Sequence, residues 1–263
     1  MSMQSAGALP KSALWVDDVA IEFGGVKAVA GVSLEAQAGA VTAVIGPNGA
    51  GKTTLFNVLS GLYRPTRGRF ALFGEDVTHQ PPFRLAMSGL SRTFQNLQVF
   101  FQMTAAENVM VGNHLSESHN PWRHLLPLPG LFQEERAARK AALEELAHVG
   151  LEDVADRPAG DLPYGGLKRL EIARALAAKP RVLLLDEPAA GCNAVETKAL
   201  AALIRRLADE GLAVVLVEHD MSMVMQLCDQ VVVLAEGKVI ARGTPGEVQA
   251  DKAVREAYLG TEQ

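Results

Sequence analysis

The sequence predicts an α/β protein with a largely parallel sheet, an antiparallel β lobe and a helical subdomain. Buried strands of parallel sheets are continuous apolar runs, and four short runs rich in Val and Leu fit that description, at 41–45, 182–185, 213–217 and 230–235. Helical patterns lie between or after these runs, at 52–60, 167–178, 194–209 and 246–258. Alternation of strands and helices favours a parallel sheet with helices packed against it.

Two further regions differ from this alternation. Residues 14–35 and 67–78 have the pattern of short strands and turns, which predicts an antiparallel lobe, and 235–243 predicts a hairpin that turns at Glu236-Gly237. Residues 100–165 contain no strand-like run but include a long helical pattern that ends at Gly150. We therefore expect a helical insertion between the halves of the α/β core.

Composition and charge exclude several classes of protein. The chain has 263 residues, is 48% hydrophobic, and carries a net charge of −5 without a run of like charges, so a nucleic-acid partner held by a basic face is not expected. Cys192 and Cys228 lack metal-ligand spacing and are interpreted as small, partly buried residues of a reducing compartment. Residues 1–16 lack the apolar core of a signal peptide, and the apolar runs are too short to span a membrane, which predicts a cytoplasmic protein.

A glycine-rich loop, "GPNGAGKTT", directly follows the strand at 41–45 and opens a helical pattern. Such a loop turns successive backbone amides inward around phosphate groups, Lys52 adds a positive charge, and the Thr53 hydroxyl suits Mg²⁺. The pattern therefore predicts binding of ATP, by Gly46, Pro47, Asn48, Gly49, Ala50, Gly51, Lys52, Thr53 and Thr54. The alternative is a glycine-rich turn with a solvated lysine.

Two carboxylates end the apolar strand in "VLLLDEP". Asp186 is predicted to hold Mg²⁺ through water, and Glu187 to act as the general base that polarises the attacking water. A second carboxylate here distinguishes a Mg²⁺-dependent ATPase from a domain that only binds nucleotide. The alternative is a charged strand end that leads into a proline turn.

Two isolated polar residues acquire a possible role in this context. His219 ends the strand at 213–217, so its imidazole is expected at the same sheet edge as Asp186, within reach of the γ-phosphate. Gln95, in "SRTFQNLQ", is a candidate ligand of Mg²⁺ or of the lytic water. The alternatives are a structural histidine and a solvated glutamine.

These motifs occur in an order that resembles the ATP-binding subunits of ABC transporters: "GPNGAGKTT", "TFQN", "GGLKRLEIARAL", "LLLDEP" and "VEHD". The resemblance runs from about Leu14 to Gly260 and implies a single cassette of a RecA-like P-loop core and a helical subdomain. It divides the chain into three parts. A core with the β lobe covers 14–99 and 180–245, a helical subdomain with the signature loop covers 100–179, and a C-terminal helix and tail cover 246–263. Two cassettes of this family pair head to tail around two ATP molecules.

By this resemblance, Phe23 stacks on adenine, Gln95 links the catalytic site to the membrane subunit, Glu187 is the catalytic glutamate, and His219 is the switch histidine. Asn193 stands where the family's interface loop usually has aspartate, although an asparagine keeps the polar shape.

The signature loop, usually Leu-Ser-Gly-Gly-Gln, corresponds here to Leu162, Pro163, Tyr164, Gly165 and Gly166. Proline is well tolerated at the first position of a helix, so the loop is expected to keep its fold. It lacks, however, the serine hydroxyl, one backbone N–H and the glutamine amide. Losing one hydrogen bond to a charged group costs about 1.5–3 kcal/mol, so we expect a weakened composite site. The resemblance then favours pairing with a second, different ATPase subunit that has an intact loop, over pairing with a second copy of this chain.

Within the family, "SRTFQNLQVFFQMTAAENVMVGNH", Tyr164 and the tail "REAYLG" resemble the ATPases of branched-chain amino acid importers, whereas Pro163 and Gly166 depart from them. The resemblance implies two membrane permease subunits, a periplasmic solute-binding protein reached only indirectly, and a peripheral location at the cytoplasmic face of the inner membrane. It also implies that 96–109 receives a helix of the membrane subunit; the alternative is that Phe100, Phe101 and Met103 pack inside the helical subdomain.

Three other functions remain open at this stage. The nearest is the ATPase of a lipid or lipopolysaccharide ABC transport complex, against which "SRTFQN" and Tyr164 argue. A soluble ABC ATPase of DNA repair or translation would carry a long coiled coil or two cassettes. A nucleotide-dependent clamp that does not hydrolyse ATP would not need Glu187.

Overall fold

The larger sheet is largely parallel, as the sequence predicts. The computed structural model describes residues 9–113 and 131–259, and within them six strands form this sheet in the order β10-β9-β3-β8-β7-β6. Neighbouring strands are parallel except β10, which forms an antiparallel hairpin with β9. The strands are β3 (Val41–Ile45), β6 (Leu90–Arg92), β7 (Val182–Asp186), β8 (Ala213–Val217), β9 (Gln230–Ala235) and β10 (Lys238–Gly243).

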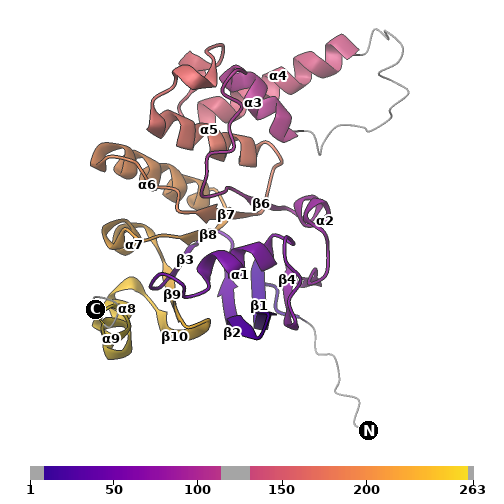
Figure 1. The fold of residues 1–263 in the computed structure, drawn as a ribbon. Helices are drawn as coiled ribbons and strands as arrows, with labels where there is room; N and C mark the ends of the chain where they lie inside the picture. The colour runs from indigo at the N-terminus through magenta and orange to yellow at the C-terminus, as the bar shows by residue number, and fades with distance from the viewer. Residues whose placement is uncertain (1–8, 114–130, 260–263) are drawn as a thin grey trace.

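A second, antiparallel sheet lies beside the first and confirms the predicted β lobe (Figure 1). In the described residues it has four strands in the order β2-β1-β4-β5. They are β1 (Leu14–Phe23), β2 (Val26–Ala36), β4 (Arg67–Leu72) and β5 (Glu75–Asp76). β1 and β2 have 10 and 11 residues and are longer than the short strands that the sequence predicts. Bulges interrupt their pairing and let the long hairpin twist while the two strands stay paired.

The helices agree with the predicted pattern at most positions. Those of the core and the C-terminus are α1 (Lys52–Leu59), α2 (Pro82–Met87), α6 (Ala194–Asp209), α7 (Met221–Leu227), α8 (Pro245–Ala250) and α9 (Lys252–Leu259). Between β6 and β7 lie α3 (Ala105–Gly112), α4 (Leu131–His148) and α5 (Tyr164–Leu176), with short 3₁₀ turns η3 (Glu152–Val154) and η4 (Ala159–Asp161). None of the helices in the described part of the chain is both long and apolar enough to cross a membrane.

Two expectations need correction, and two elements were not predicted. The pattern at 246–258 is not one helix, because Asp251 takes an extended conformation between α8 and α9. The helix expected from 167 begins at Tyr164, so Pro163 is its N-cap and not its first residue. β6 and α2 lack a distinct pattern in the sequence and were not anticipated.

One helix end and one turn follow the predicted chemistry. Gly150 has a φ of 70°, and the Leu151 amide donates to the Leu146 carbonyl, which is how a glycine ends α4. Glu236 and Gly237 both have positive φ, as a two-residue hairpin turn between β9 and β10 requires.

Alternate residues of the parallel strands contribute to two separate cores. Val44, Leu184 and Val215 face the antiparallel sheet and α1, whereas Ala43, Leu183 and Val214 face the helices α3 to α7. The large sheet is therefore covered on both faces, which explains why its strands are apolar at every position.

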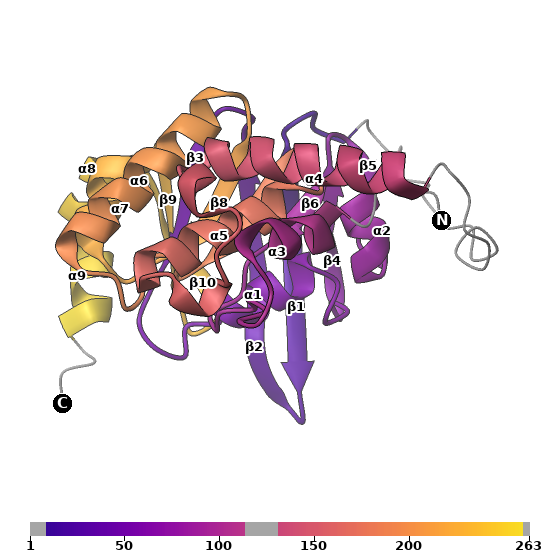
Figure 2. The ribbon, with the colours of Figure 1, turned by 90° about the horizontal axis from the view of Figure 1, so that it is seen from above.

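Helices α3, α4 and α5 form a separate layer at one end of the molecule (Figures 1 and 2). They lie between β6 and β7 in the chain, where the helical insertion was expected. The proposed division into 14–99 with 180–245, 100–179 and 246–263 stays a prediction. Residues 1–8, 114–130 and 260–263, which fall in the predicted N-terminal segment, insertion and tail, lie outside the described residues.

Candidate functional site

The glycine-rich loop connects β3 to α1 in a conformation that its glycines alone allow. Gly46 has a φ of 151°, and a Cβ there would lie 2.0 Å from the Leu234 carbonyl oxygen. Gly51 has a φ of 98°, and its Cβ would lie 2.4 Å from the Ala28 carbonyl oxygen. Both sites therefore exclude any side chain. The first amides of α1 have no acceptor within the helix.

Lys52 is buried inside this loop. Its Nζ donates to the carbonyl oxygens of Gly46 at 2.7 Å and Pro47 at 3.0 Å. Burial lowers the pKa of Lys52, and the charges of Glu187 and Asp186 oppose that shift. The ammonium group is thus held in place by the loop's own backbone.

A cavity of about 410 Å³ opens above the loop, and its wall includes half of the predicted site residues. Its wall consists of Val26, Lys27, Ala28, Glu187, His219, Glu236 and Asn48 through Thr54. Within the described residues, the wall includes none of Phe23, Gln95, Asp186 or the signature loop. Phe23 ends β1 nearby, half exposed, in edge-to-face contact with Tyr63 at 5.2 Å.

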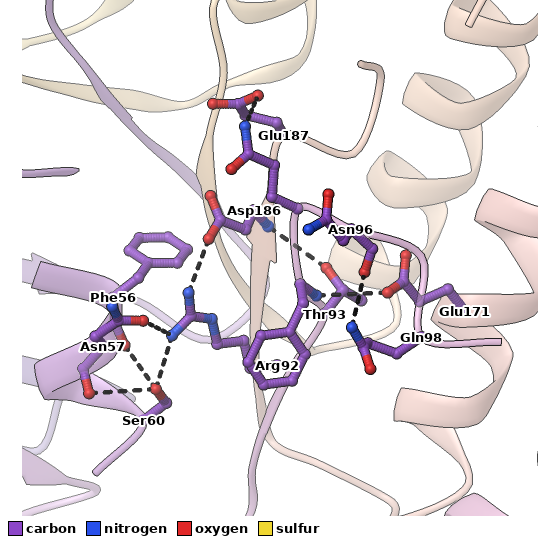
Figure 3. A network of polar contacts seen from close by, with 12 residues as sticks. Phe56, Asn57, Ser60, Arg92, Thr93, Asn96, Gln98, Glu171, Asp186 and Glu187 are labelled. Carbon is purple, nitrogen blue, oxygen red and sulfur yellow. Dashed lines mark hydrogen bonds and ion pairs between the residues drawn. The ribbon is translucent and has the colours of Figure 1, made fainter. Parts of the chain in front are cut away.

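Asp186 ends β7 behind this cavity, and its side chain is 2% exposed. Its Oδ2 accepts a hydrogen bond of 2.8 Å from Arg92 (Figure 3). Its Oδ1 is buried and has no hydrogen-bond partner among the described residues. A buried carboxylate oxygen without a partner is costly, so this oxygen is available to a ligand of the site.

Glu187 contacts two other polar residues predicted for catalysis, Gln95 and His219. Gln95 Nε2 donates to Glu187 Oε2 at 3.0 Å, and His219 Nε2 lies 3.0 Å from Glu187 Oε1. Glu187 has a φ of 50°, which is rare for a residue with a side chain and costs of order 1 kcal/mol or more. The strained backbone directs this carboxylate away from the strand and toward the cavity.

The signature loop lies apart from this cavity, at the N-terminus of α5. The Gly165 amide donates to Glu196 Oε1 at 3.1 Å, and the other oxygen, Oε2, accepts from the Asn193 amide at 3.0 Å. Asn193 in turn caps α6, with its Oδ1 accepting from the amides of Val195 and Glu196. The asparagine that replaces the usual aspartate thus acts as a helix cap, and a carboxylate of the same chain occupies an amide of the signature loop.

Several residues at the site had no role in the sequence analysis. Glu218 is buried, and its carboxylate accepts from the amides of Ala189 and His219, so that it joins the loops after β7 and β8. Glu171 of α5 accepts from the Phe94 amide at 3.5 Å, and burial raises its pKa while Lys168 opposes the shift. Burial also raises the pKa of Tyr258. A hydrogen bond from the Gly46 backbone partly offsets this rise.

These residues were missed for a common reason. Each acts through a contact that is distant in sequence, although Glu218 lies in "VEHD", Glu171 in "GGLKRLEIARAL" and Tyr258 in "REAYLG". By contrast, the sequence did indicate the aromatic residues at 96–109 as a candidate surface for the membrane subunit. Phe100 and Phe101 are about half exposed, so they do not pack inside the helical layer.

Comparison with known proteins agrees with this geometry. The family model described as ABC transporter matches residues 29–190. The chain belongs to the ABC transporter family. A second model, described as branched-chain amino acid ATP-binding cassette transporter, matches residues 238–263. As a member of the ABC transporter family, the chain is an ATP-binding and ATP-hydrolysing subunit.

Similar proteins of this family include transport ATPases of several bacteria. The high-affinity branched-chain amino acid transport ATP-binding protein BraF of Pseudomonas aeruginosa is 45% identical over 94% of this chain and 97% of its own length. LivG of Escherichia coli, of the same description, is 40% identical over the same shares. The lipopolysaccharide export system ATP-binding protein LptB of Acidithiobacillus ferridurans is 37% identical over 87% of this chain and 89% of its own length.

Solved structures of ABC transporter cassettes confirm the RecA-like fold expected for the family. The ADP conformation of an ATP-binding cassette of an ABC transporter superposes with a TM-score of 0.83 at 33% identity, over 94% of this chain and 98% of that chain.

Proposed function

We propose that this chain is the ATPase subunit of an importer of branched-chain amino acids. The observation that carries the proposal is the contact of Glu187 with Gln95 and His219 at the mouth of the loop cavity, in a chain 45% identical to BraF. The first feature supplies the chemistry of ATP hydrolysis, and the second supplies the class of solute.

The proposed roles follow from the positions of the side chains. Lys52 and the loop amides from Gly46 to Thr54 hold the β- and γ-phosphates. Glu187 accepts a proton from water as the water oxygen attacks the γ-phosphorus. The bond from the γ-phosphorus to the bridging oxygen breaks and leaves ADP and phosphate. Gln95 and His219, which both contact Glu187, orient the water and the γ-phosphate, and Phe23 stacks on adenine.

The residues at this site fit a magnesium ion. Asp186 Oδ1 is a buried carboxylate oxygen without a partner among the described residues, and the Thr53 hydroxyl lies in the cavity wall. No group of three His, Cys, Asp or Glu side chains in the described ranges forms a metal cage, as expected for an ion that takes its remaining ligands from phosphates and water. Thr53, Asp186 and Gln95 would hold the ion, which neutralises charge that develops on the phosphates.

We further propose that the composite sites form with a second, different ATPase subunit. Pro163 has neither a hydroxyl nor an N–H, and the Gly165 amide is engaged by Glu196, so this signature loop offers a partner's γ-phosphate fewer donors. Tyr164 and Gly166 belong to the same proposed contact. The competent site would combine Lys52, Glu187 and His219 of this chain with the partner's intact loop.

Two membrane permease subunits are the other proposed partners. A hollow of about 250 Å³ lies between the core and the helical layer, and its wall includes Leu62, Phe94 and Arg174. Exposed Phe100, Phe101 and Met103 follow Gln95 in the chain, so an apolar helix of a membrane subunit would lie next to the catalytic glutamine. The chain would then be peripheral at the cytoplasmic face of the inner membrane, and a periplasmic solute-binding protein would act on it only through the permeases.

Lipopolysaccharide export is the second candidate, because LptB is 37% identical to this chain. Transport reconstitution separates the two. We would express the chain with the permease and ATPase genes that neighbour its own, reconstitute the complex in proteoliposomes with its binding protein, and measure ATP hydrolysis. We expect stimulation and uptake with leucine, isoleucine or valine and none with aspartate. A complex that is stimulated by lipopolysaccharide and not by these amino acids would contradict the importer.

A further inference from the structure

A buried arginine joins the helix that follows the phosphate loop to the carboxylate at the end of β7. Arg92 ends β6, and its side chain is 5% exposed. One guanidinium nitrogen, Nη1, donates to Asn57 Oδ1 at 2.7 Å and to Ser60 Oγ at 2.8 Å, at the end of α1. The other, Nη2, donates to Asp186 Oδ2 at 2.8 Å (Figure 3).

Two aromatic rings hold the guanidinium group in this orientation. The Phe56 ring centroid lies 5.7 Å from Cζ of Arg92, and the Phe94 centroid lies 4.9 Å from it. Both distances are within the range of cation–π attraction, which strengthens when the charge is removed from water. The planar guanidinium donates hydrogen bonds from two separate nitrogens and can bind α1 and β7 at once. The single ammonium of a lysine cannot bind both.

The two elements joined by Arg92 carry two of the three proposed magnesium ligands, Thr53 and Asp186, at fixed points in the chain. Asn57 lies four residues after Thr53 on α1, and Asp186 is the last residue of β7. Because Asp186 gives Oδ2 to Arg92, the carboxylate cannot rotate freely, and its unpartnered Oδ1 is the oxygen that remains. Without this contact, nothing else in the described residues restrains the Asp186 side chain through a hydrogen bond.

We propose that Arg92 is a positioning residue that sets the Asp186 carboxylate and the Thr53 hydroxyl at the separation that a divalent cation requires. Arg92 does not contact the cation or the nucleotide and acts only through Asp186 and α1. The inference rests on the proposed magnesium site and adds the residue that assembles it. Arg92 also belongs to the segment that carries Gln95, three residues later, so a movement of that segment would shift both the lytic glutamine and the cation ligand.

The test compares cation binding with nucleotide binding in Arg92→Lys. Lysine keeps the positive charge beside Asp186 but reaches only one of the two elements. In the presence of ADP, we expect Mn²⁺ binding, measured by electron paramagnetic resonance, to weaken by about tenfold, as the loss of a hydrogen bond to a charged group implies. ADP affinity in EDTA, measured by calorimetry, should change by less than about twofold, since the loop contacts do not involve Arg92.

Two further variants separate positioning from general stability. Asn57→Ala removes one of the two contacts on the α1 side and leaves the contact with Asp186 in place. It should weaken Mn²⁺ binding by a few-fold in the parent but not in Arg92→Lys, which has already lost the contact with α1. Arg205→Lys is the matched control, since Arg205 also joins three groups, Asp209, Asp229 and the Gly39 carbonyl, away from the nucleotide cavity. It should lower the unfolding temperature without a change in Mn²⁺ binding.

The outcomes distinguish this inference from the function on which it rests. If ADP binding by the parent protein shows no dependence on Mg²⁺ or Mn²⁺, the proposed metal site itself is wrong, and the role of Arg92 is overturned with it. If the parent shows the dependence and both Arg92→Lys and Asn57→Ala bind Mn²⁺ as the parent does, only the positioning role is overturned. Should Arg92→Lys fail to fold, Asn57→Ala decides alone.

Discussion

At the scale of single residues, the site depends on Glu187, which holds a strained backbone conformation and two side-chain contacts. Its φ of 50° turns the carboxylate out of the line of β7, and Gln95 and His219 then contact one oxygen each. The sequence placed Glu187 and His219 after strands of the same sheet, whereas Gln95 was indicated by the family resemblance, because β6 was not anticipated. Their mutual contact depends on the order β8-β7-β6, which sequence alone does not give.

Replacing this carboxylate tests its proposed role as general base. We expect Glu187→Gln to lower the rate of phosphate release by at least about a hundredfold, because an amide cannot accept the proton of water. ATP affinity should change little, since glutamine keeps the size of the side chain. Glu236→Gln is the control, as Glu236 lies on the same cavity wall. Turnover by Glu187→Gln at the parent's rate would refute the assignment.

At the scale of elements, α5 connects the signature loop to the loop that carries Gln95. Its N-terminus contacts α6 through Gly165 and Glu196, and its middle contacts the Phe94 amide through Glu171. The sequence predicted this helix but began it three residues late, because the run Pro163, Tyr164, Gly165 and Gly166 resembles a turn. Proline at the N-cap, with extended ψ, is compatible with the helix that follows, and tertiary contacts outweighed the low helix propensity of glycine.

The missing donors of the signature loop can be restored by one substitution. In the reconstituted complex we expect Pro163→Ser to raise ATPase activity and ATP affinity, because serine supplies a hydroxyl and an N–H where proline has neither. The hydroxyl can also cap α5 and stabilise the chain by about 0.5–1 kcal/mol. Pro158→Ser, at the N-cap of η4, is the control and should not raise the activity. Unchanged ATPase activity and affinity in Pro163→Ser would show that the loop is not deficient.

At the scale of the whole molecule, a few polar contacts join elements that are distant in sequence. Asp229, at the start of β9, accepts from the Val41 amide of β3 at 2.7 Å and from Arg205 of α6 at 2.8 Å. Burial raises the pKa of Asp229, but the contacts with Val41 and Arg205 outweigh it, so the pKa is lowered overall. Because the folded pKa lies below the unfolded value near 3.9, this contribution to stability is present above about pH 4 and is lost as pH falls through the folded pKa.

The pH dependence of stability gives the corresponding prediction. We expect Asp229→Asn to lower the free energy of unfolding by on the order of 1 kcal/mol at pH 7, a modest value because the pair is partly exposed and screened. The difference from the parent should shrink as the pH falls from 4 toward 2, as chemical denaturation at each pH would measure. Asp209→Asn removes a more exposed partner of Arg205 and should have a smaller effect. A difference that does not depend on pH would contradict this account.

The sequence by itself determined the strand–helix alternation, the phosphate loop and the type of residue at each strand end, because these depend on local patterns of apolar residues, glycines and carboxylates. It placed β3, β8 and β9 at the correct residues, β7 one residue short at its end, and α6 from 194 to 209, but it missed β6. Tertiary structure alone decided the pairing of Arg92 with Asp186 and of Glu196 with Gly165, and the covering of both sheet faces. These contacts join residues 94 and 31 positions apart, and a chain that close-packs two cores can bring such residues together in ways that no local pattern encodes.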